Sequence, residues 1–213
     1  MKSGITITIA LVAGLAASAF MMPADEIKQL ELGASLPMPE YKMQEVSGKE
    51  IVLKDIKKEK GLLVVFSCNS CPFVVGNGET SEGWEGRYNN LGDVAARRNI
   101  GMILVNSNEA KRDGDDSFEK MQARAKEKAY RVLYALDKNS ALANAFGAKT
   151  TPHVFLFDQN LKLVYKGAID DNVGSAASVK ERYLIDAISS VGAGEEIKVK
   201  ETKPMGCSIK RVK

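Results

Sequence analysis

A short apolar run that ends at two cysteines constrains this chain more than any other feature. Leu62–Phe66 is unbroken and rich in residues that favour strands, and its length suits a strand buried on both faces of a sheet. Cys68 and Cys71 follow, and Pro72 comes directly after them. Proline is accepted in the first turn of a helix, where its missing N–H would have no partner. The sequence therefore predicts a central strand, a turn that carries both cysteines, and the start of a helix.

The position of the cysteines at a helix start has chemical consequences. Unpaired N–H groups and the helix dipole stabilise an anion there, so we expect a depressed pKa for the more exposed thiol. Cys68, on the outer side of the turn, is the predicted nucleophile. Cys71, inside the first helical turn, is placed to attack the mixed disulfide that Cys68 forms with a substrate.

Three other interpretations of the cysteine pair stay open. A structural disulfide with this spacing would close a very small loop and so constrain the unfolded chain little. A zinc site would need two further ligands, for which the chain offers only Cys207 and His153. The two thiols could also be inert core side chains. A strand that leads into two closely spaced cysteines favours redox chemistry.

Several motifs together resemble the thioredoxin superfamily. Residues 64–74 read Val-Val-Phe-Ser-Cys-Asn-Ser-Cys-Pro-Phe-Val, Thr151–Pro152 precedes an apolar strand, and Gly167–Asp171 follows later. The strongest similarity is to the redoxin, or peroxiredoxin-like, branch, and it extends from Ala34 to Val191. The tail segment 206–210, Gly-Cys-Ser-Ile-Lys, is also similar to that branch.

This resemblance implies roles for residues outside the cysteine turn. Pro152 would be a cis proline that faces the cysteines, and Thr151 would offer backbone hydrogen bonds to a substrate. The sequence also departs from the thioredoxin pattern, because the strand Leu62–Phe66 lacks the buried acid that thioredoxins keep there. Glu79 or Glu82 would have to supply a carboxylate near the thiols.

The order of elements predicts a three-layer α/β/α thioredoxin-like fold with an N-terminal β-hairpin extension. We expect strands at 41–46, 50–53, 62–66, 101–106, 131–135, 152–157 and 162–168, and helices after Cys71 and at 84–98, 118–128, 141–146 and 178–191. Asp116–Ser117 and Ser140 are the expected N-caps of two of these helices, and Gly147 is the expected end of one.

The N-terminus reads as an export signal. Lys2 precedes an apolar stretch, and Ala17–Ser18–Ala19 matches a signal-peptidase site. We expect a signal peptide over 1–19, a spacer over 20–33, a thioredoxin-like domain over 34–193, and a basic C-terminal tail over 194–213. The predicted location is periplasmic or extracellular, with an uncleaved N-terminal membrane anchor as the alternative.

These observations predict an exported thiol–disulfide oxidoreductase that acts on protein thiols and disulfides with a separate electron donor. We expect no cofactor, no metal, no nucleic-acid partner at a net charge of +3, and no stable membrane association after signal cleavage. Two alternatives stay open. One is a peroxiredoxin-like thiol peroxidase, although the chain lacks an arginine-supported peroxidatic motif, and the other is a Cu(I)-binding chaperone that uses His153.

Three further features carry expectations. The glycine-rich segment Gly76–Gly83 should form a loop beside the thiols that takes part in choosing substrates. Trp84 is either a substrate platform or an aromatic side chain packed under that loop. Cys207 is either a buried thiol that holds the tail or an auxiliary resolving thiol that reaches the Cys68 side of the site, and Ile209 is expected to dock on the domain.

Overall fold

The computed structural model describes residues 27–212. The predicted signal peptide and the first part of the predicted spacer lie outside these residues. At the centre is β3 (Gly61–Ser67), which is buried along its whole length. Its side chains alternate between two apolar cores: Leu63 and Val65 enter one, while Leu62 and Phe66 enter the other. The predicted strand buried on both faces is confirmed.

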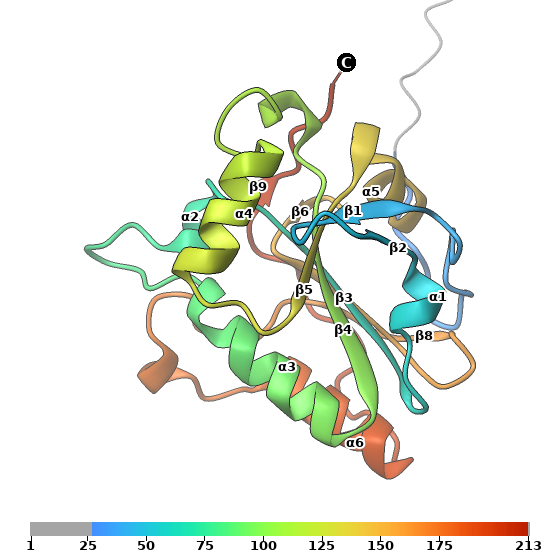
Figure 1. Cartoon of the computed structure of the whole chain (residues 1–213). Coiled ribbons are helices and arrows are strands. Elements are labelled where there is room, and N and C mark those ends of the chain that lie inside the picture. Colours follow the sequence, from blue (N-terminus) through green and yellow to red (C-terminus); the bar gives the residue numbers. More distant parts are fainter. Residues whose placement is uncertain (1–26, 213) are drawn as a thin grey trace, which may run out of the picture.

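The main sheet has seven strands in the order β2-β1-β5-β4-β3-β7-β8 (Figure 1). β3 runs parallel to β4 and antiparallel to β7, and the N-terminal hairpin β1–β2 extends the sheet beyond β5. The other six strands of this sheet are β1 (Met43–Glu45), β2 (Glu50–Ile51), β4 (Ile100–Asn106), β5 (Leu133–Leu136), β7 (His153–Phe157) and β8 (Leu163–Gly167).

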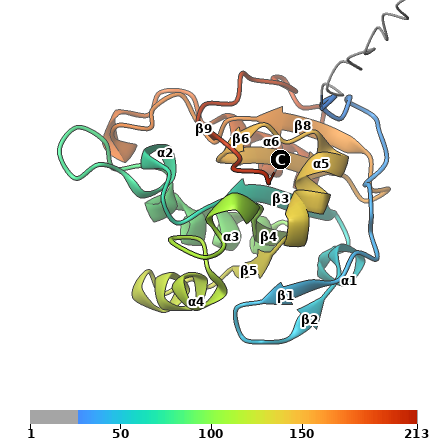
Figure 2. The ribbon, with the colours of Figure 1, turned by 90° about the horizontal axis from the view of Figure 1, so that it is seen from above.

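Helices cover both faces of the sheet, which confirms the three-layer prediction (Figures 1 and 2). Side chains of α3 (Tyr88–Arg97), α4 (Phe118–Glu127) and α6 (Tyr183–Ala193) enter the first core, and those of α1 (Leu53–Ile56) and α5 (Ala141–Phe146) enter the second. The short helix α2 (Pro72–Val75) follows the cysteines. None of the helices within residues 27–212 is long and apolar enough to cross a membrane.

Some predicted helix ends are confirmed and others differ: α6 begins at Tyr183 rather than at 178, and α3 begins at Tyr88 after a 3-10 turn at Glu85–Arg87. Gly147 ends α5 in the left-handed conformation at φ 63°, as predicted, and Ser117 caps α4 by accepting the Lys120 N–H. Ser140 does not cap α5, because its side chain makes no capping bond. The Asp137 carboxylate instead accepts the N–H groups of Leu142 and Ala143 at 2.9 and 3.0 Å.

The C-terminal segment returns to the domain and joins a second, two-stranded sheet. β9 (Cys207–Ser208) pairs antiparallel with β6 (Thr150–Thr151), and Figure 2 shows the two strands side by side. Ile209 is 5% exposed, and its N–H donates to the Lys149 carbonyl at 3.0 Å. The predicted docking of Ile209 on the domain is confirmed.

Candidate active site

The cysteine turn connects the end of β3 to the start of α2, as the sequence predicts, but two details differ. Cys71 is the N-cap residue of α2 and lies just before its first turn. Both thiols are buried, with exposures of 2% for Cys68 and 4% for Cys71. The expectation that Cys68 is the exposed sulfur is therefore wrong, because other segments of the chain cover this end of β3.

The two sulfurs and the Thr151–Pro152 segment form one cluster. The Cys71 N–H donates to Cys68 Sγ at 3.3 Å, and Cys68 Sγ lies 3.2 Å from Thr151 Oγ1. The Cys71 thiol donates to the Thr151 carbonyl at 3.0 Å. The Thr151–Pro152 peptide is cis, as the resemblance implied. Residues far apart in the sequence thus surround the thiol pair with hydrogen-bonding groups.

Cys207 completes this cluster from the opposite end of the chain. In the β6–β9 pair Cys207 is the register partner of Thr151, and its N–H donates to Cys71 Sγ at 3.3 Å. Cys207 is partly exposed, unlike the other two cysteines. The expectation that Cys207 reaches the Cys68 side of the site is not met by these contacts, since its bond is to Cys71.

The two thiols shift each other's pKa in opposite directions. The neighbouring Cys68 side chain, together with the Cys207 side chain and N–H, lowers the pKa of Cys71 to about 5, against the opposing effect of burial. The Cys71 side chain and burial raise the pKa of Cys68. The lower of the two pKa values thus belongs to Cys71, whereas the argument from the helix start assigned it to Cys68.

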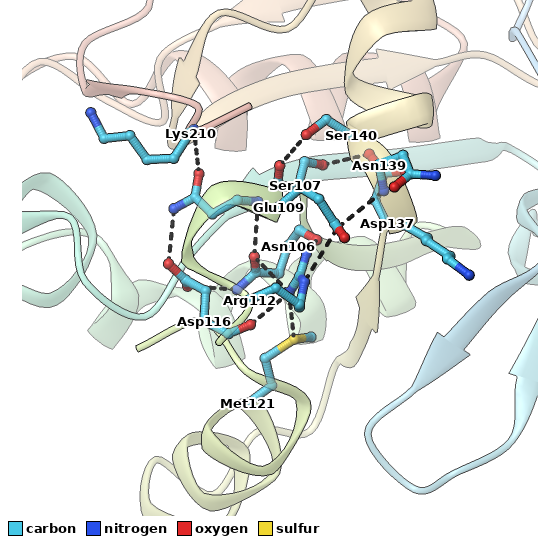
Figure 3. A network of polar contacts seen from close by, with 12 residues as sticks. Asn106, Ser107, Glu109, Arg112, Asp116, Met121, Asp137, Asn139, Ser140 and Lys210 are labelled. Carbon is cyan, nitrogen blue, oxygen red and sulfur yellow. Dashed lines mark hydrogen bonds and ion pairs between the residues drawn. The ribbon is translucent and has the colours of Figure 1, made fainter. Parts of the chain in front are cut away.

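A buried aspartate that the sequence analysis treated only as a helix cap supports the cysteine turn. Asp116 accepts the Asn69 N–H at 2.7 Å and the Ser70 hydroxyl at 3.2 Å, so it holds both residues between the cysteines. Its carboxylate also accepts the side-chain amides of Asn106 and Asn108 at 2.7 and 3.0 Å. Figure 3 shows Asn106 and Arg112 gathered around Asp116.

Comparison with known families decides the identity of the chain. The Redoxin family profile matches residues 33–182. This chain belongs to the redoxin family. No curated protein sequence matches it. Family membership and the thioredoxin-like fold together establish a thiol redox function for this redoxin.

Solved structures agree with the family assignment. An uncharacterized conserved protein from Geobacillus kaustophilus is 28% identical, with a TM-score of 0.76 over 85% of this chain and 93% of that one. A hypothetical protein from Sinorhizobium meliloti 1021 is 27% identical, with a TM-score of 0.76 over 87% and 97%. The thioredoxin domain of a thiol-disulfide oxidoreductase from Bacteroides vulgatus is 19% identical, with a TM-score of 0.51 over 66% and 90%. Peroxiredoxin structures share the fold at lower identity.

The only histidine of this redoxin lies away from the thiols. The His153 ring packs 4.5 Å from the Phe155 ring, which belongs to the second core, whereas both cysteines belong to the first. Its Nδ1 accepts the Lys149 N–H at 3.2 Å, and its Nε2 lies 3.0 Å from the side-chain amide nitrogen of Gln29. Burial lowers the pKa of His153 to about 3. His153 is thus a core histidine whose two nitrogens are occupied.

Trp84 plays a structural part in this redoxin, while the role of the loop Gly76–Gly83 in choosing substrates stays a prediction. Trp84 is 0% exposed and donates its indole N–H to Asp170 at 2.8 Å, so the substrate-platform interpretation is wrong and the packing interpretation is confirmed. Glu82 accepts the Ala176 N–H at 2.8 Å, away from the thiols. Within residues 27–212, no hydrogen bond joins Glu79 or Glu82 to either cysteine of the turn. Asp116 is the carboxylate that contacts the turn.

Proposed function

We propose that this redoxin is a thiol–disulfide oxidoreductase whose Cys68–Cys71 pair alternates between dithiol and disulfide. The observation that carries the proposal is the close contact of the two cysteines: the Cys71 N–H donates to Cys68 Sγ at 3.3 Å, and both sulfurs contact Thr151. This surrounding lowers the pKa of Cys71 to about 5. A thiolate at neutral pH is the nucleophile of disulfide exchange, and a neighbouring thiol is what resolves the mixed disulfide. A structural pair of thiols needs neither property.

The proposed reaction reverses the roles predicted from the sequence. The Cys71 thiolate attacks one sulfur of a substrate disulfide, forms a mixed disulfide, and releases the other substrate sulfur as a thiolate. Cys68 then loses its proton to solvent and attacks Cys71 Sγ. This step forms the Cys68–Cys71 disulfide and releases the second substrate thiol. Two electrons pass from the pair to the substrate, and a dithiol electron donor must return them.

Substrate docking and location extend the proposal. Thr151 and Pro152 border both sulfurs, so we assign docking of the substrate disulfide to this segment. Protein disulfides are the proposed substrates, and the periplasm or the cell exterior is the proposed location, on the strength of the N-terminal sequence pattern. The domain limits 34–193 remain predictions.

The two alternative functions gain no support from the site. Within the described residues, no hydrogen bond joins an arginine to Cys68 or Cys71, whereas a thiol peroxidase of the expected kind would place one beside its thiolate. A Cu(I) site built from these cysteines and His153 does not fit, since the histidine lies in the other core. Across residues 27–212, no group of three or more potential metal-binding side chains forms.

A trapping experiment tests the proposal. Purified protein is titrated in glutathione redox buffers, and turnover of insulin disulfides is measured with dithiothreitol as reductant. We expect the Cys68–Cys71 disulfide in the oxidised protein, turnover in the wild type, and background turnover in Cys68→Ser and Cys71→Ser. Cys68→Ser should retain a disulfide bond at Cys71, because the resolving partner of Cys71 in the pair is missing. A wild type that reduces no disulfide, or that consumes hydrogen peroxide instead, would contradict the proposal.

A further inference from the structure

We propose that Cys207 is a relay thiol, through which an external dithiol reduces the buried Cys68–Cys71 disulfide. This inference rests on the proposed function of that pair. Both sulfurs of the pair are almost inaccessible, at 2% and 4% exposure, whereas Cys207 is partly exposed. Disulfide exchange needs a direct approach of one sulfur to another, so the accessible thiol of the cluster is the natural point of entry.

The fold seats Cys207 against Cys71 through several independent contacts. On one side of Cys207, Ile209 is buried and bonded to Lys149, and the Lys210 N–H donates to the Asn108 side chain at 2.9 Å. On the other side, a Cβ at position 206 would lie 2.3 Å from the Thr151 carbonyl oxygen, so only glycine permits this close approach.

The pairing of β9 with β6 also places Cys207 where the proposed substrate would dock. Thr151 borders both sulfurs of the pair and is the register partner of Cys207. The segment that would receive an external disulfide is therefore paired with β9, which carries its own thiol and would have to separate from β6 before a substrate could dock there directly. An internal thiol at this position passes the disulfide on, instead of merely blocking the site.

The relay balances in atoms and electrons. Starting from the Cys68–Cys71 disulfide, the Cys207 thiolate attacks Cys71 Sγ, the Cys68–Cys71 bond breaks, and Cys68 leaves as a thiolate that takes up a proton. A dithiol reductant then attacks Cys207 Sγ and releases Cys71 as a thiolate. The second thiol of the reductant attacks its own mixed disulfide and frees Cys207. The reductant ends as a disulfide, and the protein ends with three thiols.

The chemistry of the three thiols suits these steps. A sulfur with a low pKa leaves faster, and Cys71 is the leaving group when the reductant attacks Cys207. In the dithiol state the pKa of Cys207 is raised to about 11, by burial and by its contacts with Cys71. Those contacts with a Cys71 thiolate vanish once Cys71 is in a disulfide, so Cys207 ionises more readily in the oxidised state, which is the state where it must attack.

Stopped-flow reduction of the oxidised protein by dithiothreitol tests the relay. Cys207→Ser keeps the backbone N–H that contacts Cys71 but removes the sulfur. We expect its Cys68–Cys71 disulfide to be reduced roughly tenfold more slowly or worse, because attack must then reach a buried sulfur directly. The matched control is Ser208→Ala, which changes the neighbouring exposed side chain of the same strand and should keep the wild-type rate.

Two further measurements test the relay without the Cys207→Ser variant, in case that variant folds poorly. Iodoacetamide treatment of the oxidised wild type should modify Cys207 and slow reduction similarly. Mass mapping of oxidised Cys68→Ser should find a Cys71–Cys207 disulfide. A wild-type reduction rate in Cys207→Ser, or a reduced Cys207 in oxidised Cys68→Ser, overturns the relay while leaving the proposed function intact. A wild type that forms no Cys68–Cys71 disulfide overturns the proposed function itself.

Discussion

On one face of the sheet, Cys68 and Cys71 lie among hydrogen-bonding groups. On the other face, His153 packs against the Phe155 ring. The thiols contact a hydroxyl, a carbonyl and a third thiol-bearing residue. His153 is equally buried, but its neighbours hold it in the neutral form. Burial is similar on the two faces, whereas the side chains and their hydrogen-bond partners differ, and these differences decide which side chains can react.

The two cores also differ in the segments that cover them. In the first core, which contains Cys68 and Cys71, the two-residue strands β6 and β9 cover the cysteine turn, and these strands come from distant parts of the chain. In the second core, on the side of His153, aromatic rings pack against one another with Phe146 at their centre. A short strand pair can separate at much lower cost than a packed aromatic cluster. Exchange with external molecules is thus feasible on the first face only.

The largest expected effect on stability comes from removing the Phe146 ring from the aromatic cluster of the second core. The Phe146 ring lies 5.3 Å from Phe66, 5.2 Å from Phe155 and 5.7 Å from Phe157. Phe146→Ala should lower the free energy of unfolding by about 3–5 kcal/mol, because it leaves a cavity in a packed core. Urea denaturation followed by circular dichroism measures this loss. The redox potential of the thiol pair should stay unchanged in protein that remains folded. A shifted potential would show that the two faces are coupled.

The second prediction uses pH to test whether His153 is held neutral. Its pKa is 6.5 when unperturbed and about 3 in the folded protein, so the unfolded state binds a proton that the folded state does not bind. Stability from this group is complete above pH 6.5 and falls as pH falls toward 3, by about 1.4 kcal/mol per pH unit.

His153→Gln is the control for that pH dependence. His153 is the only histidine in the chain, so the variant should lose the corresponding part of the slope between pH 6.5 and 4.5. Unfolding free energies of both proteins, measured by urea titration at several pH values, give the comparison. Equal slopes in the two proteins would mean that His153 takes up its proton in the folded state and that this face is less closed than described.

The third prediction tests how the Asp116 carboxylate affects the cysteine turn. Asp116→Asn removes a charged acceptor from beneath the cysteine turn and should lower the free energy of unfolding by about 2–3 kcal/mol. The pKa of Cys68 is raised mainly by the neighbouring Cys71 side chain and by burial, and the Asp116 charge adds to this. Alkylation of Cys68 should therefore begin at a lower pH in the variant.

Asp115→Asn provides the matched control for Asp116→Asn. Asp115 is the adjacent aspartate and is exposed, so its substitution makes the same change of charge. Its hydrogen bond to the turn runs from the Asn69 side-chain amide to the Asp115 backbone carbonyl at 2.9 Å, which the substitution keeps. The pH profile of alkylation, followed residue by residue with mass spectrometry, should shift in Asp116→Asn and not in Asp115→Asn. Equal shifts in both variants would mean that overall charge, rather than the buried contact, sets the reactivity.

Local sequence patterns were sufficient to predict most of the fold. The apolar run of β3 has the composition and length of a buried strand, and α5 ends at Gly147 because the left-handed conformation there favours glycine. The cap of α5 was mispredicted, since Ser140 has the right residue type but the wrong backbone geometry. The carboxylate that replaces it comes from Asp137, before a kink that the sequence pattern does not mark.

The candidate site was less predictable because long-range contacts build it. The cysteines and Thr151–Pro152 were found through their local motifs, but Asp116 contacts Asn69 from 47 positions along the chain. Cys207 contacts Cys71 across a separation of 136. The prediction that Cys68 would be the thiolate assumed an exposed sulfur. Cys68 is instead buried and contacts Thr151, 83 positions along the chain, and such a long-range contact leaves no periodic pattern in the sequence.

The smallest expected effect concerns Trp84, the large aromatic residue of the thiol face. Its indole N–H bonds to Asp170, which also accepts Arg87 Nη1 at 2.6 Å and the Asn172 N–H at 3.0 Å. Trp84→Phe removes one of these donors, and the remaining ones keep the carboxylate satisfied. We therefore expect a loss of about 1 kcal/mol in the free energy of unfolding, typical of one hydrogen bond. Turnover of insulin disulfides should stay at the wild-type level, because Trp84 is buried and touches no thiol through a hydrogen bond. Reduced turnover at unchanged stability would return Trp84 to the substrate site and show that the thiol face opens more widely than the β6–β9 pair alone.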